Sequence, residues 1–501
     1  MTAHSKNETS TFGRLIVAVA LLLVFIIATR TPADADLWWH LRAGDEMAQR
    51  GEILLEDVFS YTRAGETWVN AFWLADILLY LVYKLGGYFA LGGFVAFMAA
   101  ATLAIVNSRM KGNASLRASI LILAATAFAP IWTPRPQLFS FLLLALLDRW
   151  LYSLKDKNRQ DAKSFFAPPG NLWLLIPFFA LWANLHGGYI WGILLLIAEL
   201  VGGIFDRWFS SEEAQLSGKT LKKLSGFTLL AVLAVLLNPN GIALWKLPFH
   251  TVDVSLAVIQ EWLSPDFHQF HLHPMLWMLF LLIAGLGLSR EPIRYGDLFK
   301  VLGFAYMTFV SQRNIAPFAI IAAPLIVRHL SLFLDDRQNT PAGMLVRRLS
   351  TDSASKQLPL NVARGINILL IFLISLAALG NLYLVTRPAE VDAQYPVDAI
   401  RWIDENQPRG ALFNSYNWGG YLTWILRDYP VYIDGRADLY GDEIIGEWWQ
   451  VVRGGESAHQ ILDARQINLI LLEPSWPLLD ELPIHGWQLL YQDEKAVVYG
   501  R

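Results

Sequence analysis

Apolar runs long enough to cross a lipid bilayer recur along this chain from Phe12 to Tyr383. About 20 apolar residues in a helix cross roughly 30 Å of hydrocarbon, so each run predicts a membrane-spanning helix. About eleven spans are predicted, at residues 12–29, 88–106, 118–132, 137–153, 171–184, 188–205, 225–238, 274–289, 298–311, 314–329 and 366–385. After about residue 388, apolar and charged residues alternate as in water-soluble domains. The sequence therefore predicts a polytopic α-helical membrane domain over 1–387 and a small water-facing domain over 388–501.

The composition fits this division and excludes several classes of protein. Hydrophobic residues make up 54% of the 501 residues and charged residues only 17%, against roughly 25% charged in an average soluble protein. The net charge of −3 and the lack of a long basic stretch give no footprint for nucleic acid. The absence of cysteine excludes disulfides, thiolate metal sites and thiol catalysis.

Lys and Arg between the predicted spans set the orientation, because these residues accumulate in cytoplasmic loops. The segment from about Asn70 to Leu85 decides the outcome: it is short, carries charges, and has the aromatic pattern of a helix lying at the interface. If this segment does not cross the membrane, the loops between later spans that are rich in Lys and Arg all lie on the cytoplasmic side. The N terminus is then cytoplasmic, and residues 31–87, 239–273 and 388–501 lie outside. With the lack of cysteine, this arrangement favours a bacterial inner membrane.

Two aspartates, Asp34 and Asp36, follow the first predicted span directly. Trp38, Trp39 and His40 come next and would anchor this stretch at the membrane surface. Two carboxylates at i and i+2 in such a place could supply a general base or ligands for a metal ion. The alternative interpretation is solvated charge beside an ordinary aromatic belt.

Tight turns on the predicted outer side carry candidate binding residues for a phosphate group. Arg135 lies between two prolines, and Arg313 and Asn314 lie in a very short turn between two spans. A guanidinium fixed near the interface suits a phosphate, whereas ordinary lipid snorkelling is the alternative. His186 precedes two glycines that allow close approach of the backbone, although a lone histidine is more often structural.

The outer loop 239–273 holds Glu261 and Asp266 near three histidines. Their spacing matches no closed zinc site. We therefore expect a polar binding loop that packs over a cavity, with a metal site as the lesser alternative.

The water-facing region has the pattern of an α/β domain. It predicts a helix near 396–405 and strands near 411–413, 431–434, 468–472, 489–491 and 496–499. Ligands commonly bind beyond the carboxyl ends of strands in open α/β sheets, so the residues after 434 are predicted to contact a ligand. Candidate ligand-binding residues on the predicted outer face are Trp38, Trp39, His40, Asn417, Trp418, Asp434, Arg436 and Asp438. Asp434, Arg436 and Asp438 could equally form a structural ion-pair turn.

With these features in order, the chain resembles the GT-C superfamily of membrane glycosyltransferases. Its membrane half is similar to protein O-mannosyltransferases and aminoarabinose transferases in its number of spans, its acidic first outer loop and its interfacial helices. It also resembles bacterial membrane proteins that combine an Asp-rich first loop with the pattern Ile433-Asp434-Gly435-Arg436. In the family an acidic residue after the first span serves as base or metal ligand, which implies such a role for Asp34 and Asp36. Residues 417–421 are a loose counterpart of the oligosaccharyltransferase acceptor motif but lack its aspartate, so a peptide sequon is not supported.

Residues and resemblance together predict an inverting glycosyltransferase of the GT-C type. It would move a sugar from a polyprenyl-phosphate donor to a glycan, lipid or protein acceptor on the extracytoplasmic face, with Asp34 or Asp36 as general base. No cofactor is certain, and a divalent cation, Mg or Mn, is a candidate. The donor's phosphate and sugar would contact Arg135, His186, Glu261, Asp266, Arg313 and Asn314. The acceptor would contact Trp38, Trp39, His40, Asn417, Trp418, Asp434, Arg436 and Asp438. The alternatives are a membrane transporter and a non-catalytic subunit of a cell-envelope polymer assembly or export system.

Overall fold

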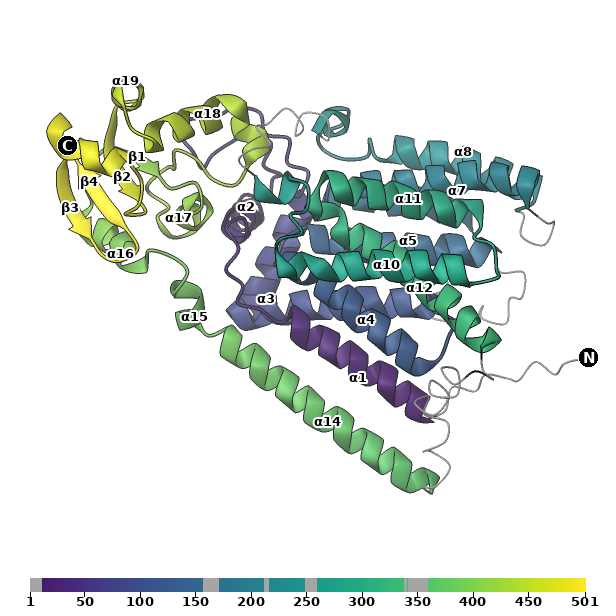
Figure 1. The fold of residues 1–501 in the computed structure, drawn as a ribbon. Coiled ribbons are helices and arrows are strands. Elements are labelled where there is room, and N and C mark those ends of the chain that lie inside the picture. Colours follow the sequence, from purple (N-terminus) through teal and green to yellow (C-terminus); the bar gives the residue numbers. More distant parts are fainter. Residues whose placement is uncertain (1–10, 156–170, 211–215, 248–258, 338–339, 341–358) are drawn as a thin grey trace, which may run out of the picture.

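The computed structural model describes residues 11–155, 171–210, 216–247, 259–337, 340 and 359–501. Long helices form a bundle, and a smaller α/β domain sits at one end of it, which we call the site end (Figure 1). The chain is thus a polytopic helical protein with a small C-terminal sheet, as predicted. Residues 248–258 of the predicted outer loop 239–273 lie outside the described residues.

Every predicted span coincides with a helix of the bundle. These helices are α1 (Thr11–Ala28), α3 (Trp73–Arg109), α4 (Ala114–Phe128), α5 (Gln137–Lys155), α6 (Leu175–Leu185), α7 (Tyr189–Phe209), α8 (Gly218–Ala234), α10 (His273–Leu288), α11 (Tyr295–Val310), α12 (Ile315–Asp336) and α14 (Leu360–Val385). By length and composition, 7 helical stretches among the described residues are able to cross a membrane, and two further apolar helices are shorter. The count of eleven spans therefore stays a prediction.

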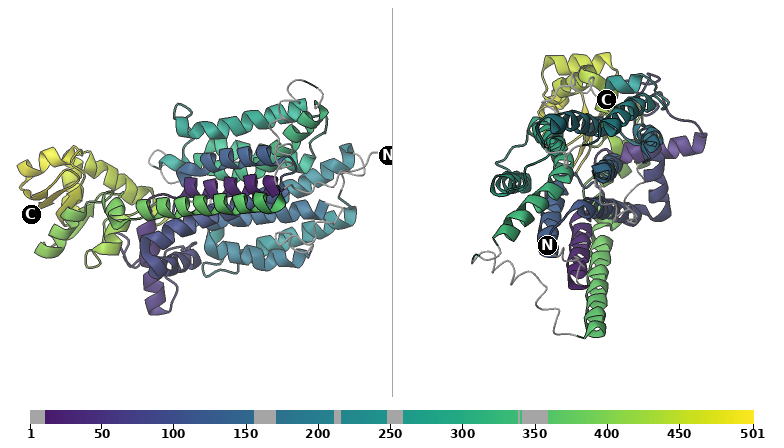
Figure 2. Two further views of the ribbon diagram at one scale, coloured as in Figure 1. Left: turned by 90° about the horizontal axis from the view of Figure 1, so that it is seen from below. Right: turned by 90° about the vertical axis from the view of Figure 1, so that its right-hand side faces the viewer.

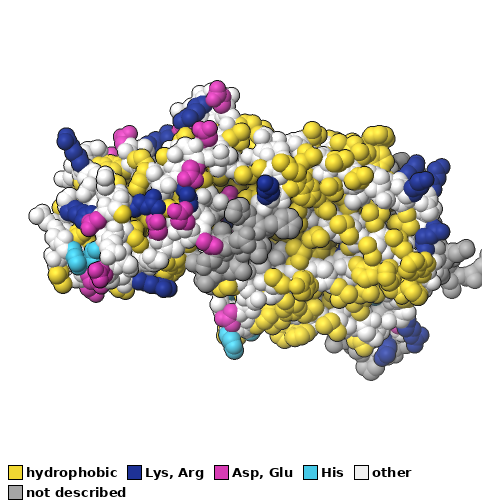
Figure 3. Space-filling view, turned by 90° about the horizontal axis from the view of Figure 1, so that it is seen from above, with side chains coloured by type: hydrophobic (Ala, Val, Ile, Leu, Met, Phe, Trp, Pro, Cys, Tyr) yellow, Lys and Arg dark blue, Asp and Glu magenta, His cyan; other side chains and the backbone are white. Residues whose placement is uncertain are grey.

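The surface of the bundle carries the charge pattern on which the orientation was predicted. Figure 3 shows a belt of hydrophobic side chains over the bundle, with Lys and Arg gathered at the end away from the α/β domain. Figure 2 shows the long helices running side by side, with α14 along the edge of the bundle. Lipid-facing side chains need no partners inside the protein, which accounts for the many exposed apolar residues of α14.

The first outer loop folds back across the site end. α2 (Leu37–Arg50) is seen end-on in Figure 1, whereas the long helices run across the view. The first part of α3 is separated from the apolar span that follows by a break at Gly86 and Gly87. Gly87 has a φ of +57°, which a residue without a Cβ adopts at little cost. The predicted interfacial segment 70–85 ends at this break.

The C-terminal domain packs helices against a four-stranded sheet of order β1-β2-β4-β3. β1 and β2 are parallel, and the other pairs are antiparallel. The strands are β1 (Ala411–Asn414), β2 (Ile467–Leu472), β3 (Gln488–Gln492) and β4 (Val497–Gly500). The helices are α15 (Pro388–Asp392), α16 (Val397–Asn406), α17 (Gly419–Ile425), α18 (Ala437–Val452), α19 (Glu456–Ala464) and α20 (Leu478–Glu481). The predicted strands 411–413, 468–472, 489–491 and 496–499 are confirmed.

The predicted strand 431–434 is wrong. These residues are buried but belong to no strand of the sheet, and Val431 instead forms an isolated parallel bridge with Ser60 of the first outer loop. The side chain of Asn414 supplies the partners that a neighbouring strand would have offered, since its Oδ1 accepts from the Tyr432 backbone N–H at 2.8 Å. A strand of a sheet and a buried extended segment can both be an apolar run followed by a turn, so the sequence pattern does not distinguish them. Only the pairing in the tertiary structure does.

The half of the bundle away from the α/β domain contains a buried ionic network. Lys300 Nζ of α11 lies 3.2 Å from Asp148 Oδ1, 2.7 Å from Glu199 Oε1 and 2.8 Å from Asp297 Oδ1. Arg109 at the end of α3 also pairs with Asp148. Buried charges are costly unless they are paired, and here they pair with one another. The network joins α3, α5, α7 and α11.

Candidate active site

Charged side chains from four separate segments meet at the site end of the bundle. Arg135 Nε lies 2.6 Å from Asp34 Oδ1, and Arg135 Nη1 lies 3.1 Å from both Asp36 Oδ2 and Glu261 Oε2. Arg313 Nη2 lies 3.9 Å from Glu261 Oε1, and its guanidinium stacks over the ring of Trp262 at 4.6 Å. Five of the residues singled out in the sequence thus lie in one cluster, which we call the carboxylate cluster: Asp34, Asp36, Arg135, Glu261 and Arg313.

Local backbone geometry holds Arg135 and Asp34 in place. Arg135 donates its backbone N–H to the Thr133 carbonyl at 2.7 Å, and the prolines on either side fix the turn before α5 begins. Asp34 Oδ1 accepts the backbone N–H of Asp36 at 2.9 Å, which is the self-bonded turn that aspartate favours before a helix. The cluster is therefore built on short, restricted turns.

The two aspartates differ in access and in electrostatics. The side chain of Asp34 is 8% exposed and that of Asp36 is 23% exposed. Burial raises the pKa of Asp36 to about 7, against the opposing effect of Arg135 and with a further increase from Asp34. Such a carboxylate can accept a proton near neutral pH, which is the property a general base needs. Asp36 is the better placed of the two for that role.

The cations of the cluster keep the third carboxylate ionised. The charges of Arg135 and Arg313 lower the pKa of Glu261, although burial opposes them. The three carboxylates in turn hold the pKa of Arg135 well above its usual value, in spite of its burial. Arg135 therefore remains a cation that organises the carboxylates around it.

Trp39 and His40 form a support behind Asp36. Trp39 Nε1 donates to Asp36 Oδ1 at 3.3 Å, and the ring of His40 lies 3.5 Å from that of Trp39. His40 Nδ1 lies 2.6 Å from Asp76 Oδ1, and both side chains are buried. Burial, followed by the charge of Arg135, holds the pKa of His40 well below its usual value, so this imidazole is neutral.

His186 is fixed in one tautomer. Its Nδ1 accepts the backbone N–H of Gly188 at 2.9 Å and lies 2.7 Å from Ser140 Oγ, which itself accepts from Trp182 Nε1 at 2.7 Å. Burial and the nearby charge of Arg313 lower the pKa of His186 to about 3. A neutral ring whose Nδ1 accepts must carry its proton on Nε2. His186 is therefore a hydrogen-bond donor beside Arg313.

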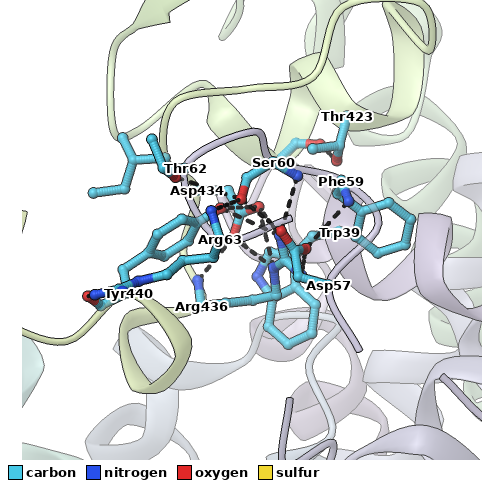
Figure 4. Close-up of polar contacts among 12 residues, drawn as sticks. Trp39, Asp57, Phe59, Ser60, Thr62, Arg63, Thr423, Asp434, Arg436 and Tyr440 are labelled. Atoms are coloured by element: carbon cyan, nitrogen blue, oxygen red, sulfur yellow. Dashed lines mark hydrogen bonds and ion pairs between the residues drawn. The ribbon is translucent and has the colours of Figure 1, made fainter. Parts of the chain in front are cut away.

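Asp434 and Arg436 are buried together in a clamp between the two domains (Figure 4). Arg436 donates to Asp434 Oδ2 at 2.7 Å and to Asp57 Oδ1 of the first outer loop at 2.6 Å. Its guanidinium also lies over the rings of Phe59 and Trp68. Because these charged side chains are wholly buried, the contacts favour the structural ion-pair turn over direct acceptor binding.

Two glycines of the C-terminal domain lie in close contact with the segment that carries Asp36. A Cβ on Gly435 would overlap Asp36 Oδ1 and would lie 3.2 Å from Trp39 Nε1. A Cβ on Gly420 would similarly meet the Ala35 carbonyl and lie 3.4 Å from Trp39 Cδ1. The C-terminal domain thus forms one wall of the site, and only glycine fits at these two contacts.

Several other candidate residues lie apart from the cluster or are engaged elsewhere. Trp38 is buried and packs edge-on against Tyr395 and Tyr421. Asn314 accepts from Trp191 Nε1 at 3.1 Å and donates to backbone carbonyls, which is a structural position. Asp266 is exposed and closes its own turn by accepting the His268 N–H. Of the remaining candidates, Asn417 is exposed, Trp418 is buried and Asp438 lies in the first turn of α18.

The carboxylates do not fit a metal ion as they lie. Within the described ranges, no group of three His, Asp or Glu side chains is arranged to hold one. Asp34, Asp36 and Glu261 instead direct oxygens toward the Arg135 guanidinium, which occupies the centre that a cation would take. Mg or Mn would therefore require rearrangement of Arg135.

Sequence reasoning missed three supporting residues. Asp76 is one of the charges of the predicted interfacial segment 70–85, where solvated charge is the ordinary interpretation. Ser140 lies in an apolar helix, and Asp57 lies in a polar loop, where neither residue type stands out. Their partners, His186 and Arg436, are 46 and 379 residues away in the chain.

No family model and no curated protein matches this sequence, whereas solved structures match over most of its length. The archaeal oligosaccharyltransferase AglB from Archaeoglobus fulgidus, in complex with an inhibitory peptide and a dolichol-phosphate, is 12% identical, with a TM-score of 0.57. The match covers 93% of this chain and 69% of that one. ArnT from Cupriavidus metallidurans, bound to undecaprenyl phosphate, is 14% identical, with a TM-score of 0.51 and 98% of each chain covered. At the level of the fold, the predicted resemblance to GT-C membrane glycosyltransferases is confirmed.

Proposed function

We propose that this chain, which shares the fold of GT-C membrane glycosyltransferases, is itself an inverting glycosyltransferase that uses a polyprenyl-phosphate-linked sugar. The observation that carries the proposal is the carboxylate cluster. It combines a carboxylate of raised pKa, Asp36, with two guanidinium groups at the end of an apolar bundle. Proton acceptor and phosphate binder are the two groups that such a transfer requires.

Asp36 acts as the general base. It takes the proton of an acceptor hydroxyl, the hydroxyl oxygen bonds to the anomeric carbon, and the bond from that carbon to the phosphate oxygen breaks. The electron pair leaves with the polyprenyl phosphate, and displacement from the opposite face inverts the anomeric centre. Asp34 is less exposed and engaged by Arg135 Nε and the Asp36 N–H, so its role is to position these groups.

Arg313 and His186 bind the departing phosphate. Arg135 is engaged by three carboxylates, whereas the ion pair of Arg313 with Glu261 is long at 3.9 Å. We assign the Nε2–H of His186, whose pKa is lowered by burial and by the charge of Arg313, as a second donor to the same phosphate. Charge-assisted hydrogen bonds of this kind stabilise negative charge as it develops on the leaving oxygen.

The setting supports a lipid-linked donor on the outer face of a bacterial inner membrane. The two fold neighbours were solved with dolichol-phosphate and with undecaprenyl phosphate. The cluster lies at the end of the bundle opposite the gathered Lys and Arg, which is the extracytoplasmic end if these residues mark the cytoplasm (Figure 3). The acceptor is then a glycan, a lipid or a protein outside the cell membrane.

The test is turnover of radiolabelled polyprenyl-phosphate sugars by the purified full-length protein. We expect Asp36→Asn to reduce release of polyprenyl phosphate by at least about 10²-fold, as for other lost general bases. Asp398→Asn, an exposed aspartate of α16, is the matched control and should retain wild-type rates. Full activity of Asp36→Asn would refute the assignment of the base. The absence of donor turnover by the wild type would instead favour the transporter or the assembly subunit.

A further inference from the structure

A cluster of aromatic side chains lies on the C-terminal domain beside the candidate active site. Its members, which we call the aromatic patch, are Tyr416, Trp448, Trp449 and Trp476. Ring centroids lie 5.3 Å apart for Trp448 and Trp449, 5.5 Å for Trp448 and Trp476, and 6.0 Å for Tyr416 and Trp448. Trp448 is buried, whereas the other three rings are partly exposed. The patch therefore presents ring surface to solvent from a fixed base.

Hydrogen bonds hold these rings in place. Glu473 accepts from Ser415 Oγ at 2.7 Å and from Trp476 Nε1 at 2.8 Å, and Trp448 Nε1 donates to the Asn414 carbonyl at 2.9 Å. Trp449 Nε1 is buried and has no hydrogen-bond partner among the described residues. The same holds for the indole N–H groups of Trp38, Trp68, Trp150 and Trp487, so this buried donor does not face a ligand on the surface.

The patch lies where small molecules bind in folds of this type. Asn414, Ser415 and Tyr416 follow the end of β1, and Glu473 follows the end of β2, and these two strands are parallel. The carboxyl ends of parallel strands are the usual place for ligands in an open α/β sheet. The rings of the aromatic patch and the carboxylate of Glu473 thus lie together at that edge of the sheet.

The patch is connected to the carboxylate cluster through Asn414. The side chain of Asn414 binds the backbone of Tyr432 and Ile433, which lead directly into the turn that presses Gly435 against Asp36. Burial raises the pKa of the Tyr416 hydroxyl, and the charge of Asp36 raises it further, so the two side chains are within electrostatic range. The patch and the turn that carries Gly435 are therefore joined through the buried side chain of Asn414.

We infer that the aromatic patch is an acceptor subsite that binds a pyranose ring of a saccharide, an inference that rests on the proposed function. One face of a pyranose carries mostly C–H groups and packs against an aromatic ring, while its hydroxyl groups need polar partners at the rim. The rings of Trp449 and Trp476 supply the apolar surface. The exposed guanidinium of Arg453, 5.2 Å from the centroid of the Trp449 ring, supplies donors for hydroxyl oxygens at the rim. The acceptor is accordingly a glycan or the sugar portion of a glycolipid.

The test is calorimetric titration of the purified full-length protein with maltohexaose, cellohexaose and chitohexaose. We expect saturable binding of at least one of these probes. Trp449→Ala and Trp476→Ala should weaken that binding by about tenfold each, whereas Trp476→Phe, which keeps an aromatic ring, should retain most of it. Trp402→Ala is the matched control, because Trp402 packs on Tyr491 elsewhere in the same domain.

The possible failures are distinguishable. No binding of any of the three saccharides by the wild type, or equal weakening by Trp402→Ala, would overturn the acceptor subsite. Thermal unfolding of each variant separates lost binding from lost folding, and Trp476→Phe keeps the test valid if the alanine variant unfolds. Release of polyprenyl phosphate by wild type in water, without any saccharide, tests the proposed function separately. That reaction could succeed while saccharide binding fails.

Discussion

Gly435 of the C-terminal domain lies against Asp36 of the first outer loop so closely that no side chain fits between them. This contact makes the geometry of the proposed base depend on a domain that begins more than 350 residues later in the chain. It is maintained by the buried clamp of Arg436 with Asp434 and Asp57 (Figure 4).

Replacement of Gly435 by alanine should displace Asp36 and reduce turnover by roughly 10²-fold, because a shift of about 1 Å at a reacting group can cost that much. Gly446→Ala is the control, since a Cβ there meets nothing within 4 Å. Turnover of a polyprenyl-phosphate sugar is the measurement. Equal rates for the two variants would show that this wall does not position the base.

The rate should depend on the protonation of Asp36. Its pKa is about 7, and a general base acts only when deprotonated, so kcat/KM should rise with pH and level off above about 7. Arg135 lowers this pKa, and Arg135→Gln should therefore move the rising limb to higher pH. A pH–rate profile of each protein checks both statements. A limb that stays near pH 4 in the wild type would contradict the assignment.

Two substitutions of His186 separate its hydrogen-bonding roles. Gln places an amide near the position of Nε2 and should retain part of the donor contact to phosphate, whereas Asn mimics only Nδ1 and should not. We expect His186→Asn to reduce turnover by about 10²-fold more than His186→Gln, as for one lost donor to developing charge. Rates measured on the same donor decide this. A more active Asn variant would indicate that the contacts with Ser140 and Gly188 matter more.

Loss of one partner of the buried clamp should be strongly destabilising. Arg436→Ala leaves Asp57 and Asp434 buried without their cation, at a cost of about 3–5 kcal/mol. The exposed pair of Arg401 and Asp398 is the control, where Arg401→Ala should cost roughly 1 kcal/mol or less. Thermal unfolding and limited proteolysis in detergent measure both effects. Similar stabilities for the two variants would contradict a structural role for the clamp.

The buried network of Lys300 should matter for folding of the bundle. Lys300→Met leaves Asp148, Glu199 and Asp297 without this shared partner, and we expect a loss of about 3–5 kcal/mol. Lys222→Met, an exposed lysine of α8, should change little. Thermal stability of the detergent-solubilised proteins is the readout. If Lys300→Met is as stable as wild type, the network has another purpose.

The amino-acid sequence alone determined the helical membrane architecture and the small C-terminal sheet. Membrane helices satisfy their backbone within each segment, so length and hydropathy are sufficient to locate them. The strands β2 and β4 could be located from short apolar runs, INLILL and VVYG, that are bounded by polar residues. Asp34 and Asp36 could be singled out as a carboxylate pair directly after a span, Arg135 and Arg313 as cations in tight turns, and Glu261 as a carboxylate in an outer loop.

Only the tertiary structure decided how these residues relate to one another. The raised pKa of Asp36 depends on its burial in the tertiary structure, and its ion pair is with Arg135, which lies about a hundred residues away. The run 431–434 failed to become a strand because its partners are Asn414 and Ser60 rather than a neighbouring strand. The roles of Gly435 and Arg436 likewise depend on contacts with the first outer loop. Side-chain type and local pattern carry no information on such long-range pairings, since the packing of the two domains sets them.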